Sequence, residues 1–121
     1  MRVLTYSIAV SVLLAFATSH VATAAEVFCK IKGPRHLLPS TIHKLRSGMK
    51  AKEIEKLLGK PHYSPAQGQY YYGTNDNCAV MGGLEVYCGY VLDFVNDQSE
   101  DKENPSAGAT LEDCYWGPIP E

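Results

Sequence analysis

The stretch that decides the fold of this chain is Ser47-Gly-Met-Lys-Ala-Lys-Glu-Ile-Glu-Lys-Leu-Leu-Gly-Lys-Pro61. It predicts one short helix, because Ser47 can cap the first turn, Gly59 suits the left-handed position that ends a helix, and Pro61 prevents continuation. Four apolar residues recur at helical spacing and form one stripe: Met49, Ile54, Leu57 and Leu58. A helix this short is not stable alone, so it must pack on another element.

The first 24 residues have the composition of a secretory signal peptide. Arg2 supplies a positive charge, residues 3–17 are mostly apolar, and Ala22-Thr23-Ala24 is a small-residue cleavage site. An uncleaved anchor is the alternative, but the apolar segment is short for a membrane span. We therefore expect cleavage after Ala24, a periplasmic or secreted mature protein, and no transmembrane span once the signal is removed.

The cysteines all follow the predicted signal peptide, at Cys29, Cys78, Cys88 and Cys114. An even number in a small exported domain predicts two disulfides, which would help to stabilise a core of this size. Three pairings are possible and the sequence does not choose among them, although local loop closure favours Cys78–Cys88 together with Cys29–Cys114. A zinc site is the alternative, but the chain has no C-x-x-C pair and no histidine at ligand spacing. We expect neither a metal nor another cofactor.

After Pro61 the pattern changes from a helical period to the alternation of strands. We expect strands over residues 69–72, 84–96 and 109–116, with a loop at 74–83 and a flexible acidic loop at 97–107. A second helix candidate at 41–46 precedes the main helix, so the two would form a helical hairpin. The predicted fold is therefore α+β, with two layers: a helical hairpin packed on a three-stranded antiparallel meander.

The predicted domain spans residues 41–116, with an N-terminal arm at 25–40 and a tail at 117–121. Within the arm, residues 26–32 are predicted as either a short strand or an extended segment. Its expected core consists of Ile42, Leu45, Met49, Ile54, Leu57, Leu58, Tyr71, Val86, Tyr90, Leu92, Phe94, Leu111 and Trp116.

The formal net charge is −2, but the charges are unevenly distributed. Nine of the eleven basic residues lie between Lys30 and Lys60, whereas acidic residues predominate from Asp93 onward. One interpretation is two solvated surfaces that attract each other weakly. The other is a basic surface that contacts anionic lipid head groups or an acidic partner; its residues are Lys50, Lys52, Lys56 and Lys60. Nucleic acid is not an expected partner of an exported chain with net negative charge.

The chain contains no pattern typical of catalysis. His36, His43 and His62 lie in unrelated contexts, and the serine-hydrolase, zinc-protease and phosphate-loop motifs are absent. The tyrosines have two interpretations. Tyr70, Tyr72 and Tyr87 either line a solvent-facing surface without function or form a contact surface for a protein partner.

The helix signature resembles a known family. Gly48-Met49, Glu53-Ile54 and Leu57-Leu58-Gly59-Lys60-Pro61 resemble the Gly-Met…Val-x-x-Leu-Leu-Gly-x-Pro signature of the BamE (SmpA/OmlA) family. The segments Tyr70-Tyr71-Tyr72-Gly73 and Val91-Leu92-Asp93-Phe94-Val95 resemble strands of that family. The resemblance covers about residues 41–116. It implies a small, non-catalytic cell-envelope protein, with two helices on an antiparallel sheet, that assists outer-membrane assembly.

Two functions remain open. The β-lactamase-inhibitor-like proteins share the same helix-plus-sheet unit, so a secreted inhibitor or immunity protein is the alternative to an envelope assembly factor. The chain also lacks a lipoprotein motif, because Glu26-Val27-Phe28 precedes Cys29 where small residues would be needed. We therefore expect an unlipidated exported protein that binds other proteins.

Overall fold

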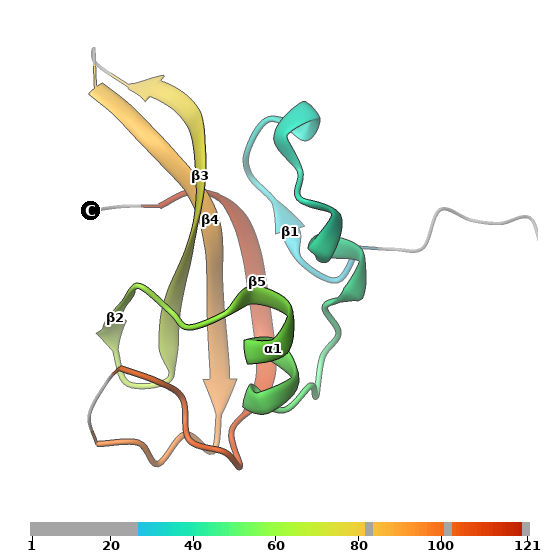
Figure 1. Ribbon diagram of the computed structural model, residues 1–121, viewed down its shortest axis with the longest axis vertical. Helices are drawn as coiled ribbons and strands as arrows, with labels where there is room; N and C mark the ends of the chain where they lie inside the picture. The colour runs from blue at the N-terminus through green and yellow to red at the C-terminus, as the bar shows by residue number, and fades with distance from the viewer. Residues whose placement is uncertain (1–26, 82–83, 101–102, 120–121) are drawn as a thin grey trace, which may run out of the picture.

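The computed structural model describes residues 27–81, 84–100 and 103–119 (Figure 1). The predicted signal peptide and its cleavage site lie outside the described residues. Within the described ranges, no helix is both long and apolar enough to cross a membrane.

One mixed sheet dominates the described part of the chain. Its strands lie in the order β1-β5-β4-β3-β2, and only the β1–β5 pair is parallel. The strands are β1 (Lys30–Ile31), β2 (Tyr63–Ala66), β3 (Gln69–Met81), β4 (Leu84–Val95) and β5 (Thr110–Pro118). The other elements are the α-helix α1 (Ala51–Leu58) and the short 3₁₀ helices η1 (Arg35–Leu37) and η2 (Ser40–Lys44).

The predicted helical hairpin on a three-stranded meander is wrong. The second helix candidate forms only the 3₁₀ helix η2, which follows Pro39 and contains the β-branched residues Thr41 and Ile42. The spacing of Ile42 and Leu45 fits a 3₁₀ turn as well as an α-helix, and both side chains are buried. The sheet is also larger than predicted, because β1 and β2 add to its edges and β3 continues to Met81, inside the expected loop at 74–83.

The main helix begins later than the sequence predicts. Ser47 does not cap it; instead the Gly48 N–H donates to the Leu111 carbonyl at 2.7 Å, and the Ala51 N–H donates to the Ala109 carbonyl at 3.1 Å. Residues 48–51 therefore pair with residues 109–111, up to and including the first residue of α1. The end of the helix is as predicted, since Gly59 has a φ of 77° and donates to the Glu55 carbonyl.

Two segments expected to lie outside the domain belong to the sheet. β1 comes from the predicted arm and pairs with β5 at Tyr115 and Trp116. The predicted tail begins inside β5, which continues to Pro118, and the Ile119 N–H donates to the Tyr87 carbonyl. The Gly-Pro pair therefore does not end the strand, because Gly117 and Pro118 still pair with Gly89 and Cys88 of β4.

The core lies between the sheet and the layer formed by α1, η1 and η2, which we call the helical layer. Figure 1 shows α1 lying over β5. The strands contribute mainly aromatic and cysteine side chains to this inner face: Tyr70, Tyr72, Cys88, Tyr90, Leu92, Phe94, Leu111, Cys114 and Trp116. Burial raises the pKa of Tyr90 to about 12, although a hydrogen bond with Thr41 acts in the opposite direction.

The core prediction is correct for most of its members. Met49, Leu57 and Leu58 pack partly buried against the core. Tyr71 and Val86 are only half-buried, so their place in the predicted core is wrong. Two disulfides, Cys29–Cys114 and Cys78–Cys88, form as the favoured pairing predicts. They are consistent with an exported protein or an oxidising environment.

Candidate binding surface

The tyrosines chosen from the sequence as a contact surface divide between two faces of the sheet. Tyr70 and Tyr72 are 1% and 3% exposed, so they form part of the core and their prediction as contact residues is wrong. Tyr71, between them, points to the opposite face because side chains alternate along a strand. Tyr87 is 50% exposed and remains available for contact.

One row of side chains crosses four strands on the face opposite the core, which we call the outer face. Tyr63 in β2 pairs with Tyr71 in β3, Tyr71 with Val91 in β4, and Val91 with Tyr115 in β5. We call these four residues the tyrosine row. Tyr63 is 62% exposed, and its ring lies 5.8 Å from the Tyr71 ring at an angle of 53°. Val91 is buried, since tyrosines flank it on both sides.

A row of glycines lies beside the tyrosine row, at Gly73, Gly89 and Gly117. A Cβ at Gly73 would be 2.6 Å from His62, one at Gly117 would be 2.8 Å from the Lys32 side chain, and one at Gly89 would collide with Ile119. Because the glycines have no side chains, His62, Lys32 and Ile119 can lie directly against the sheet. The chain itself covers this part of the outer face, whereas Tyr63 and Asp113 are exposed and Tyr71, Asp93 and Tyr115 are half-exposed.

On its other side the tyrosine row borders a polar row formed by Gln69, Asp93 and Asp113. The Gln69 amide donates to Asp93 Oδ1 at 3.1 Å. Asp113 is exposed, and its Oδ1 accepts the backbone N–H of Cys114 at 2.9 Å. The outer face thus combines aromatic rings with two carboxylates.

The two edge strands β1 and β2 are short, but β3 continues to Met81 beyond its pairing with β2, so the hairpin part of β3 has an edge that β2 does not cover. β1 has only two residues, and β2 contains Pro65 and an irregular register with β3. Short edges, prolines and irregularities all disfavour the addition of another strand. Among the described residues, the short strands β1 and β2 are therefore less suited to strand addition than the hairpin part of β3.

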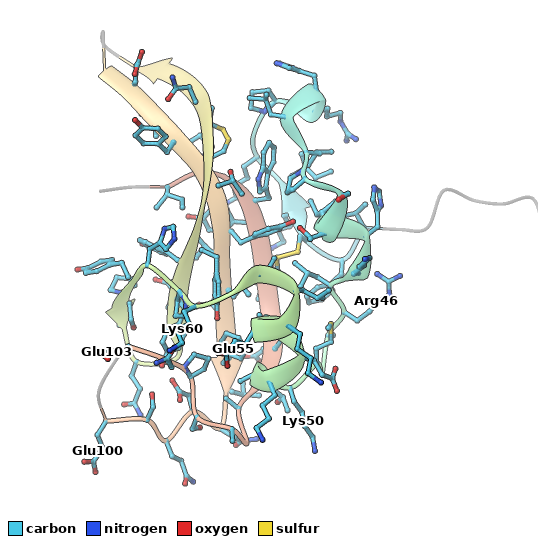
Figure 2. All side chains as sticks on the ribbon, viewed as in Figure 1. Arg46, Lys50, Glu55, Lys60, Glu100 and Glu103 are labelled. Carbon is cyan, nitrogen blue, oxygen red and sulfur yellow. A yellow bond between two sulfur atoms is a disulfide. The ribbon has the colours of Figure 1, made fainter. Side chains whose placement is uncertain are left out.

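Of the basic surface, Lys52 and Lys56 lie on α1 and Lys50 directly precedes it, whereas Lys60 follows the helix and lines one hollow with Tyr63 and Glu103. Lys50, Lys52, Lys56 and Lys60 are all exposed. Lys52 and Lys56 are one helical turn apart, on the side of α1 opposite the buried Ile54. Figure 2 shows Arg46 and Lys50 pointing into solvent on one side of the molecule and Glu100 on the other. The separation of charge is incomplete, because Lys60 lies beside Glu103 and Glu55 lies on α1 (Figure 2).

Sequence reasoning missed a buried carboxylate that organises the predicted flexible loop at 97–107. The Tyr70 O–H donates to Asp97 Oδ2 at 2.5 Å, and the backbone N–H groups of Ser99 and Ser106 donate to Oδ1 at 3.1 and 2.8 Å. Burial raises the pKa of Asp97, but these hydrogen bonds outweigh it and leave the pKa below its ordinary value. Asp97 thus fixes both ends of this loop to the core.

The histidines do not converge on one site. His36 lies in η1, His43 in η2 and His62 just before β2, and all three are exposed. In the ranges that the structure describes, no cluster of histidine, cysteine and acidic side chains is arranged to hold a metal.

Comparison with protein-family models, curated proteins and solved structures finds no match to this chain. The resemblance to the BamE family therefore depends on the quoted residues alone, and residues 41–58, where the resemblance implies a pair of α-helices, contain the 3₁₀ helix η2 and one α-helix.

Proposed function

We propose that this chain is an exported, non-catalytic cell-envelope protein that binds another protein through the outer face of its sheet. The observation that supports this most directly is the tyrosine row, which crosses four strands on a face that the helical layer leaves uncovered. Aromatic rings provide a large contact area for little loss of conformational freedom, and they are common at the centres of protein interfaces.

Export and the removal of residues 1–24 form part of this proposal. The two disulfides support it, because such bonds persist in oxidising compartments. Intact-mass measurement of the exported protein tests it. We expect a chain that begins at Ala25 and carries two disulfides. A lipid mass on Cys29, or four free thiols in freshly exported protein, would contradict it.

An envelope assembly role like that of the BamE family and an inhibitor role both require a protein-binding surface. One observation favours the inhibitor as a second candidate. The β3–β4 hairpin extends past the end of β5 (Figure 1) and is held by the Cys78–Cys88 bridge, with Tyr87 half-exposed beside it. A hairpin fixed in this way loses little freedom when it enters a partner's cleft.

Photocrosslinking tests which surface makes the contact. The crosslinking amino acid p-benzoylphenylalanine would replace Tyr63, Tyr87 or, as a matched exposed control on α1, Lys56. We expect crosslinks to the same envelope protein from position 63 and none from position 56. Stronger crosslinks from position 87 to an enzyme or toxin would favour the inhibitor. Crosslinks from position 56 alone would contradict binding through the outer face.

Contact with anionic lipid head groups is a further part of the proposal, supported by the four exposed lysines of the basic surface. Each lysine near an anionic surface contributes about 1 kcal/mol, and the attraction weakens with salt. Sedimentation with phosphatidylglycerol and phosphatidylcholine vesicles tests it. We expect binding to the anionic vesicles alone, and weaker binding by the Lys52→Gln/Lys56→Gln variant. Equal binding of both vesicle types would contradict the contact.

A further inference from the structure

Tyr115, at one end of the tyrosine row, already carries a cation over its ring. The Lys32 Nζ lies 4.0 Å from the ring centroid. Lys32 follows β1 directly, and its backbone N–H donates to the Trp116 carbonyl at 2.7 Å, so the chain fixes this side chain at the edge of the outer face. An ammonium or guanidinium group over a tyrosine ring is an attractive arrangement. The contact between Lys32 and Tyr115 therefore shows that a tyrosine of this row can bind a positively charged side chain.

The other two tyrosines of the row have no such cation among the described residues. The rings of Tyr63 and Tyr71 are tilted by 53° and do not form a flat platform. A flat platform would suit the apolar face of a sugar ring, whereas tilted rings can flank a long side chain. The stem of an arginine or lysine packs well against such rings while its charged end stays near polar groups.

Two carboxylates lie beside this part of the row without a positive partner. Asp93 accepts a hydrogen bond from the neutral Gln69 amide, and Asp113 accepts one from a backbone N–H. No lysine or arginine in the described ranges forms an ion pair with either carboxylate. The pKa of Tyr115 is raised by burial and by the nearby Tyr71 and Asp93, which is consistent with the Asp93 carboxylate lying close to the row.

We propose that the outer face binds a basic segment of its protein partner. Arginine or lysine side chains of that segment lie over the rings of Tyr63 and Tyr71 and reach the carboxylates of Asp93 and Asp113. This inference rests on the proposed function, because it specifies the partner of the same surface. The carboxylates and the ring faces both attract cations, so both favour a partner segment with positively charged side chains. The same carboxylates would repel an anionic membrane.

The direct test is an NMR titration of the mature chain with an acetylated and amidated peptide of sequence Gly-Arg-Gly-Arg-Gly. The matched probe replaces both arginines with citrulline, which has a similar shape but no charge. A chitin tetrasaccharide tests for glycan binding. We expect the arginine peptide to shift the backbone amide signals of Tyr71, Asp93 and Tyr115. The citrulline peptide should produce shifts about fivefold smaller, because the charge-assisted hydrogen bonds are lost.

Two variants give this titration its controls. Asp93→Asn should weaken binding of the arginine peptide by about fivefold, whereas Glu100→Gln removes the same charge from an exposed loop residue and should leave the affinity unchanged. Binding should also weaken between about 0.01 and about 0.15 M salt, as the Debye length falls from about 30 to about 8 Å. Equal effects of the two variants would mean a general attraction to an acidic protein and would overturn the inference.

Three further outcomes would also overturn it: equal shifts from the two peptides, shifts centred on residues 97–100, or stronger shifts of the same row by the tetrasaccharide. The proposed function is tested separately by the crosslinks from position 63. If those crosslinks form while the arginine peptide shows no selectivity, the outer face binds a protein but not through basic side chains. If position 63 gives no crosslinks either, both proposals fail.

Discussion

Tyr71 and Tyr72 are chemically identical neighbours with opposite places in the molecule. Tyr72 is buried between the sheet and the helical layer, whereas Tyr71 lies in the row that crosses the outer face. The inner face also contains all four half-cystines and Trp116. The outer face carries tyrosines, carboxylates and a row of glycines. Tyrosines of one strand therefore stabilise the core on the face that the helical layer covers. On the opposite face, which that layer leaves uncovered, a tyrosine of the same strand is available for contact.

The largest effect should come from breaking the bridge that holds the N-terminal segment against the inner face. Cys29 and Cys114 are separated by 85 residues, and Cys78 and Cys88 by 10. Loop-closure entropy then predicts a loss of about 4.5 kcal/mol for Cys29→Ala/Cys114→Ala and about 2.7 kcal/mol for Cys78→Ala/Cys88→Ala. Urea unfolding measures both values. A larger loss for the shorter loop would contradict this ranking.

Truncation of the largest buried side chain comes next. Trp116 is fully buried at the centre of the inner face. Trp116→Ala should destabilise the fold by about 3–5 kcal/mol, because it removes buried apolar surface and leaves a cavity. Denaturant unfolding monitored by circular dichroism measures the change. A loss below about 1 kcal/mol, the typical value for substitutions in general, would mean that the inner face is not the main core.

A smaller loss of stability should follow when Asp97, which holds the loop at 97–107, is protonated or loses its hydrogen bond from Tyr70. The folded-state pKa of Asp97 is lowered, so its contribution to stability is present above the unfolded pKa of about 3.9 and is lost as the pH falls below it. Tyr70→Phe removes one donor from this carboxylate and should cost about 1–3 kcal/mol at neutral pH. Thermal melts between neutral and acidic pH measure both. If Asp97→Asn retains the full acid sensitivity of the wild type, another group is responsible.

The smallest effect on stability should come from the outer face. Tyr63→Ala removes a ring that is mostly exposed, so the free energy of unfolding should change by less than about 0.5 kcal/mol. The same substitution should reduce crosslinking from position 87 if both tyrosines contact one partner. A loss of several kcal/mol would show that the Tyr63 ring stabilises β2 and that the outer face has a structural role.

The parts of the fold that local pattern determines could be predicted from the sequence. Cys88, Tyr90, Leu92 and Phe94 alternate with smaller or polar residues in the predicted strand, and all four are buried. Gly59 ends the helix because few other residues adopt its backbone conformation. These predictions depend on neighbours along the chain, and tertiary contacts do not change them.

Other features depend on contacts between distant segments. Three consecutive tyrosines give no signal of whether Tyr71 or its two neighbours face inward. The pairing of Tyr72 with Tyr90 and the helical layer above them decide that Tyr70 and Tyr72 do. The late start of α1 depends on hydrogen bonds with residues 109–111. The loop at 97–107 looks flexible from its composition, but Tyr70 anchors it through Asp97. The tyrosine row itself requires the register of four strands.

The most direct test of the central claim compares Tyr71→Ala with Tyr72→Ala, the same change at adjacent positions on opposite faces. Each variant carries the photocrosslinker at position 63, and each is studied by thermal unfolding and by crosslinking to the envelope partner. We expect Tyr72→Ala to cost about 3–5 kcal/mol, or on the order of 15–30 °C in melting temperature for a domain of this size. Tyr71→Ala should melt within a few degrees of the wild type and lose most of the crosslink. If Tyr71→Ala unfolds the protein, or if it melts normally and keeps the full crosslink, the outer face is not the partner surface.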